Sequence, residues 1–167
     1  VTESKDSVNV FYRSTTISVT APELVVTDIL MNGLTTLPTV AAGQDVRLDF
    51  DVLNQGTAGT IPSVHLQWWW GTSSGAKTNP IATGDIAWFD GLSPGESERD
   101  TDASWIIPNL APGTYWITAE IDYDGRVLES NEGNNTRSES FTVIAPDVLV
   151  TDILMNGLTT LPTVAAG

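Results

Sequence analysis

Oxygen-bearing side chains crowd one short stretch of the chain, residues 122–135. Six of them could reach one cation from two facing strand ends: Asp122, Asp124, Glu129, Asn131, Glu132 and Asn134. Calcium takes about six to eight oxygen ligands, so the stretch predicts a calcium site, although its spacing is not that of an EF-hand loop. The alternative is a purely structural loop, because tight turns also favour Asp, Asn and Gly. In that interpretation Glu129 and Asn135 bond the backbone of the loop.

A second group of residues could bind a ligand through aromatic rings. Three consecutive tryptophans begin at position 68. Neighbouring strand residues point to opposite faces of a sheet, so Trp69 is predicted to face outward with His65 if the other two tryptophans face the core. Trp116 is predicted to face outward in the same way from a neighbouring strand, giving a patch suited to sugar stacking or protein contact. The alternative is that the loop at 71–80 folds over the two indoles.

The sequence offers little support for catalysis, and no enzyme activity is expected. His65 is the only histidine, there is no cysteine, and no serine stands in a nucleophile motif. The many carboxylates could mimic a glycosidase pair, but a charged strand surface is usually just solvated.

The charge balance restricts the partners. Twenty-one acidic and seven basic residues give a formal net charge of −14. Such a surface repels nucleic acid and anionic lipid, so neither is an expected partner. No apolar run approaches the ~20 residues needed to span a bilayer, so membrane insertion is not expected either.

The residues that must position these groups alternate in polarity along short segments. No helical period persists, and seven strands are predicted: 22–31, 46–52, 64–70, 81–89, 100–105, 115–121 and one containing 141–143. Short alternating strands separated by turns predict an all-β, seven-stranded immunoglobulin-like sandwich. Its predicted core contains Phe50, Trp68, Trp105, Tyr115, Ile117 and Phe141. Tyr115, near the start of the sixth strand, is placed to form a tyrosine corner.

The sequence also repeats itself. Residues 151–167 are identical to residues 27–43, which sets a period of 151 − 27 = 124 residues. Residues 1–20 are therefore interpreted as the last strand of a preceding repeat, 21–144 as one complete domain, and 145–167 as the first strand of a following repeat. A fixed period predicts a tandem, head-to-tail array whose partners are neighbouring copies of the same unit. One proline and no Gly/Ser spacer predict stiff junctions.

Several motifs resemble a known family. In order they are Pro22-Glu-Leu-Val-Val-Thr-Asp28, Ala42-Gly-Gln44, Val52-Leu-Asn-Gln-Gly56, Leu92-Ser-Pro-Gly-Glu96, Ala111-Pro-Gly-Thr-Tyr115 and Glu129-Ser-Asn-Glu-Gly-Asn-Asn135. Together they resemble the CARDB domain, the cell adhesion related domain found in bacteria. The resemblance implies an immunoglobulin-like sandwich, a structural or adhesive role without catalytic residues, and a place outside a prokaryotic cell.

The expected function is an extracellular structural or adhesive repeat module of a prokaryotic surface protein or fibre, acting as a stiff spacer or filament unit. One alternative is a carbohydrate-binding module that binds surface glycans through Trp69 and Trp116. Another is an accessory domain of a larger secreted enzyme.

Overall fold

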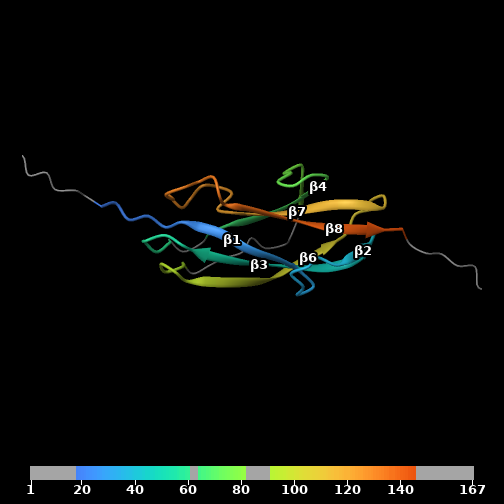
Figure 1. The fold of residues 1–167 in the computed structure, drawn as a ribbon, viewed down its shortest axis with the longest axis horizontal. Coiled ribbons are helices and arrows are strands. Elements are labelled where there is room, and N and C mark those ends of the chain that lie inside the picture. The colour runs from blue at the N-terminus through green and yellow to red at the C-terminus, as the bar shows by residue number, and fades with distance from the viewer. Residues whose placement is uncertain (1–17, 61–63, 82–90, 146–167) are drawn as a thin grey trace, which may run out of the picture.

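The computed structural model describes residues 18–60, 64–81 and 91–145, and these form strands joined by turns (Figure 1). Within these ranges there are eight strands and no helix: β1 (Leu24–Met31), β2 (Thr39–Ala41), β3 (Asp45–Asn54), β4 (Leu66–Gly71), β5 (Asn79–Ile81), β6 (Ser97–Ile106), β7 (Gly113–Ile121) and β8 (Thr136–Ile144). The described part of the chain therefore contains no helix that could span a bilayer.

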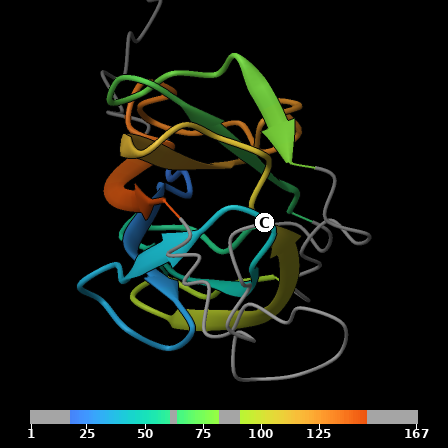
Figure 2. The ribbon, with the colours of Figure 1, turned by 90° about the vertical axis from the view of Figure 1, so that its right-hand side faces the viewer.

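The strands form two sheets that lie as two layers (Figure 2). One sheet has the order β1-β3-β6 and the other β2-β8-β7-β4-β5. The pairing is antiparallel except between β2 and β8, which run parallel. An immunoglobulin-type sandwich also places its first, second and fifth main strands in one sheet and its third, sixth and seventh in the other.

The all-β prediction is confirmed, but the count of seven strands is not. The sequence reading missed two short strands, β2 and β5, which lie at the edges of the five-stranded sheet. The strand predicted at 81–89 falls outside the described residues except for Ile81, the last residue of β5. Three-residue edge strands carry too few alternating side chains to stand out in the sequence.

Strand β3 shows how alternation produces the core. Val46, Leu48, Phe50 and Val52 are all at most 2% exposed and face the second sheet. Asp49 departs from the pattern because it is only 1% exposed. Its carboxylate lies 2.9 Å from the guanidinium of Arg47, which supplies the charge partner that a buried acid requires.

The predicted core is largely confirmed. Phe50, Trp68, Trp105, Ile117 and Phe141 are all buried, and Tyr115 is half-buried against them. Aromatic rings meet edge to face across the core, with Trp105 and Phe141 5.7 Å apart at 85°. The hydroxyl of Tyr115 donates to the carbonyl oxygen of Ala111 at 3.0 Å, which confirms the tyrosine corner.

The two ends of the sandwich carry different parts of the chain. The N-terminal segment meets β1 at one end of the long axis, and β8 leaves at the other end (Figure 1). The hairpin at 122–135 joins β7 to β8 and so lies at the end where β1 begins. We call this the proximal end and the opposite one the distal end.

Candidate metal centre

The hairpin at 122–135 is held by its first carboxylate. Asp122 takes φ +50°, a conformation that turns the chain sharply out of β7. Its two carboxylate oxygens accept the backbone N–H groups of Arg126 and Val127, both at 3.0 Å. Val127 is 3% exposed and belongs to the core cluster. The hairpin is therefore anchored both by hydrogen bonds and by an apolar side chain.

Three carboxylates of the hairpin come together. Asp122, Glu129 and Glu132 each offer an oxygen, and these atoms all lie within 4.8 Å of one another. Asp122 is buried, Glu129 half-buried and Glu132 exposed, so the group runs from the interior to the surface. Hard cations such as calcium and magnesium prefer this oxygen-only donor set.

The environment of Glu129 penalises its negative charge. Burial is the main cause that raises its pKa to about 7, and the charges of Glu132 and Asp122 add to the rise. Hydrogen bonds from the backbone N–H of Leu24 and from Asn135 act in the opposite direction. Burial also raises the pKa of Asp122. Near neutral pH the cluster therefore favours binding a positive charge, either a proton or a cation.

Two side-chain amide oxygens of the same hairpin lack a donor. The side-chain oxygens of Asn134 and Asn135 are buried and accept no hydrogen bond from any described residue. Their amide nitrogens donate to carboxylates instead, Asn134 to Glu23 at 2.6 Å and Asn135 to Glu129 at 2.9 Å. A buried oxygen without a donor is costly, and a cation could satisfy it. The residues present thus fit a hard divalent cation.

Glu23 is a site residue that sequence reasoning missed. It precedes β1, is 6% exposed, and accepts hydrogen bonds from the hydroxyl of Ser130 and the amide of Asn134. The hydrogen bond from Ser130 is the main cause that lowers the pKa of Glu23. One signal in the sequence could have identified it. Asp147 stands at the position equivalent to Glu23 in the partial repeat at 145–167, so an acidic residue occurs at this position in both copies.

Two of the six predicted ligands have other contact partners among the described residues. The carboxylate of Asp124 contacts the Nδ1 atom of His65 at 2.8 Å and the guanidinium of Arg126 at 2.6 Å. The side-chain oxygen of Asn131 accepts the backbone N–H of Gly133 at 3.1 Å, a local turn bond. The alternative interpretation of the hairpin as turn chemistry therefore describes Asn131, whereas Asp124 is held by its two side-chain partners.

The prediction that His65 faces outward is wrong. Its side chain is 6% exposed, lies against Asp124, and its ring is 6.3 Å from that of Tyr123. The backbone oxygen of His65 also accepts the N–H of Asp122 at 2.6 Å. Strand β4 begins only at Leu66, so strand alternation does not govern the orientation of His65.

Trp69 and Trp116 lie on one face of the five-stranded sheet but do not form a ring pair. In the register of β4 and β7, Trp69 is opposite Thr118 and Trp116 is opposite Gly71. Both side chains are half-buried, and the indole nitrogen of Trp69 is buried. Thr118, between them on this face, is fully buried.

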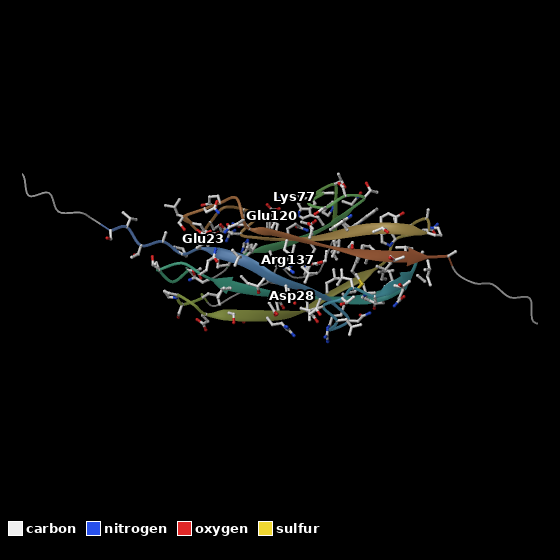
Figure 3. The ribbon with its side chains drawn as sticks, viewed as in Figure 1. Glu23, Asp28, Lys77, Glu120 and Arg137 are labelled. Carbon is white, nitrogen blue, oxygen red and sulfur yellow. The ribbon has the colours of Figure 1, made fainter. Side chains whose placement is uncertain are left out.

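The loop between β4 and β5 reaches across this face. Lys77 contacts Glu120 of β7 at 2.6 Å, and the two labelled side chains lie together in Figure 3. The N–H of Gly75 donates to the hydroxyl of Ser138 in β8 at 3.0 Å. These contacts favour the alternative in which the loop at 71–80 folds over the face that carries the two indoles.

A two-sheet sandwich with an acidic hairpin at the end where the chain enters defines an immunoglobulin-like module with a candidate cation site. The CARDB family model matches residues 21–139, and the chain belongs to this family of cell-adhesion-related domains in bacteria. A search of the curated proteins found no match.

Solved structures of the family have the same fold. The CARDB domain of a Pyrococcus furiosus protein, solved in complex with di-metal ions, is 22% identical with a TM-score of 0.56 and covers 78% of this chain and 95% of its own. A solution structure of that domain is 25% identical with a TM-score of 0.52, covering 75% and 98%. A domain of a Methanosarcina acetivorans protein is 18% identical with a TM-score of 0.52, covering 74% and 93%.

Proposed function

We propose that this unit is a non-catalytic structural or adhesive module, repeated head to tail in a protein outside a prokaryotic cell, where it acts as a stiff spacer. The observation that carries the proposal is the position of the two chain ends. The chain enters beside β1 and leaves from β8 at opposite ends of the long axis (Figure 1), so each added unit lengthens the array. The 124-residue period of the sequence and the acidic, cysteine-free composition support it.

We further propose that calcium binds at the proximal end. Asp122, Glu129 and Glu132 would hold the ion, with the amide oxygens of Asn134 and Asn135 as neutral ligands. Bound calcium would supply positive charge that offsets the repulsion among the three carboxylates. The solved di-metal complex of a CARDB domain supports this proposal.

The site would couple the ion to the junction between repeats. A carboxylate oxygen of Glu129 accepts the backbone N–H of Leu24, the first residue of β1. Glu23, one residue earlier, accepts from Ser130 and Asn134 of the same hairpin. A cation that orders the hairpin therefore also orders the start of the domain.

Thermal unfolding of the full chain with saturating calcium and with a chelator tests the site. Calcium should raise the melting temperature of the wild type, and Glu132→Gln should remove the rise. Glu132 is exposed and its Oε1 accepts the N–H of Glu129 at 3.0 Å, a bond that glutamine keeps. Loss of the negative charge of Glu132 should therefore weaken calcium binding more than it destabilises the fold.

Glu96→Gln is the matched control. Glu96 is also exposed, and it also accepts a backbone N–H three residues earlier, that of Ser93 at 2.8 Å. It lies in the loop before β6 and outside the three-carboxylate group. Calcium should stabilise this variant as much as the wild type. An equal calcium response in the Glu132 and Glu96 variants, or none in the wild type, would reject the site.

A further inference from the structure

In the proposed array, the described residues at 18–23 belong to the junction with a preceding repeat. With an offset of 124 residues, Val19 corresponds to Val143 of β8. Val143 is 1% exposed within the sandwich, whereas Val19 is 87% exposed. Equivalent positions of the repeat therefore differ, with a core residue at the end of β8 and an exposed side chain ahead of β1. The segment at 18–23, which we call the connecting segment, shows how a preceding β8 runs into β1.

The connecting segment is fixed to the domain that follows it. The carbonyl oxygens of Ala21, Pro22 and Glu23 accept backbone N–H groups from Thr57 at 2.9 Å, Ser130 at 3.3 Å and Gln55 at 2.8 Å respectively. Hydrogen bonds along the backbone leave little freedom for rotation about this segment. The direction of the chain into the domain is therefore set by the loop at 54–58 and by the hairpin.

A buried amide locks this loop in place. Asn54 is fully buried, and its side-chain oxygen accepts the N–H groups of Glu23 at 3.1 Å and Gly56 at 3.0 Å. Its nitrogen donates to the carbonyl oxygens of Ala58 at 2.8 Å and Leu92 at 2.9 Å. All four hydrogen-bonding positions of the amide are used, so its orientation is determined.

Apolar side chains are exposed at both ends of the sandwich. At the proximal end Leu128, in the hairpin, is 87% exposed. The same end carries a groove of about 410 Å³, which is lined by Val19, Ala21, Glu23, Gln55, Gly56, Thr57, Ser130 and Asn131. At the distal end Ile106 and Ile144, the last residues of β6 and β8, are 64% and 48% exposed.

The connection between repeats is short enough to bring these ends together. Strand β8 ends at Ile144, and the counterpart of Leu24 in the next repeat is residue 148. Four peptide steps span about 14 Å when fully extended. The distal segment at 106–113 contains no charged residue, so it does not repel the acidic hairpin of the next repeat.

We infer that the distal end of one repeat docks on the proximal end of the next, where the uncharged surface with Ile106 and Ile144 covers Leu128 and the groove. The occupant of this surface is a second copy of the same unit, and the inference rests on the tandem array proposed above. Docking holds successive repeats at a fixed angle, so the junction does not act as a hinge.

A two-repeat protein tests the inference. The full chain followed by residues 44–167 contains two complete repeats, because residues 145–167 already supply the counterpart of 21–43. The chain has no cysteine, so Ser140→Cys in both copies places one spin label on each domain at an exposed strand position. The distance distribution between the labels is measured by pulsed electron paramagnetic resonance in a chelator.

The expected distribution is one peak about as narrow as that of a reference pair within one repeat, Ser97→Cys and Ser140→Cys. Leu128→Ser in the second copy should broaden it at least about twofold, because that side chain faces the first domain. The same substitution in the first copy is the matched control and should leave the width unchanged. Since Leu128 is exposed, neither change should unfold its domain.

A broad distribution in the parent protein would overturn the inference, as would a second-copy variant that stays narrow. The calcium response of the single repeat is a separate measurement made without a second domain. A flexible joint with a normal calcium response would refute docking and leave the cation site standing. A narrow distance distribution without a calcium response would support docking and refute the cation site.

Discussion

Replacing Glu129 with glutamine should change how the stability of the domain depends on pH. Burial raises the pKa of Glu129 from 4.5 to about 7 in the folded state. The folded protein therefore holds this proton more tightly than the unfolded chain does. In a chelator, the free energy of unfolding should fall as the pH rises from about 4.5 to about 7, because the ionised carboxylate is poorly tolerated in its folded site.

The size of this effect follows from the two pKa values. A rise from 4.5 to about 7 corresponds to about 3 kcal/mol, at ~1.4 kcal/mol per pH unit. Glu129 is only half-buried, so solvent screening reduces the expected loss to about 1–3 kcal/mol between pH 5 and 8. The Glu129→Gln variant has no carboxyl group at this position. Its free energy of unfolding should therefore fall by about 1–3 kcal/mol less than that of the wild type over the same pH range.

Denaturant unfolding of both proteins at several pH values, all in a chelator, provides the assay. The difference between the two pH slopes is the readout, because glutamine presents an NH₂ group to one of the two donors and lowers the absolute stability at every pH. Glu23, whose pKa is lowered, loses its stabilising effect only below about pH 4.5 and so does not interfere. Parallel slopes for wild type and variant would refute this account of Glu129.

Two further substitutions test the core and the connecting segment. Trp105→Ala should destabilise the domain by about 3–5 kcal/mol because it empties a buried site against Phe141, whereas Ile106→Ala, at an exposed position, should cost no more than about 0.5 kcal/mol in the same denaturant titration. Gly56→Ala should cost more than about 1 kcal/mol, since its Cβ would lie 2.5 Å from the backbone of Ala21 and Glu23. Gly59→Ala, whose Cβ would meet its nearest atom at 3.5 Å, should cost far less, and equal losses for the two glycines would contradict the tight packing.

The sequence predicted the sandwich and its core because both depend on local alternation. Phe50 and Ile117 lie in strands where apolar and polar residues alternate, and alternation alone determines which side faces the other sheet. The corner formed by Tyr115 was predictable because its partner lies only four residues away. Features that depend on neighbours close in the sequence could therefore be predicted.

Contacts between distant segments were not predictable in the same way. Glu23 meets Asn134 across 111 residues, and His65 meets Asp124 across 59. No periodicity links such pairs, so Glu23 was missed as a site residue, and the contact between Asp124 and His65 was not predicted. The hairpin was still recognised as a candidate site because most of its carboxylates lie close together in sequence.

The parallel pairing of β2 with β8 has a mechanical consequence for an array under tension. Pulling on a tandem chain applies force at the start of β1 and at the end of β8, along the long axis of each sandwich (Figure 1). Because β2 and β8 run parallel, with Thr39, Val40 and Ala41 beside Thr142, Val143 and Ile144, force that reaches β2 through β1 slides one strand along the other. All hydrogen bonds of the pair must then break together and not one after another, as they would if the strands were peeled apart. In the proposed array, the edge strand that the sequence did not reveal would therefore act as a clamp that resists extension of each repeat.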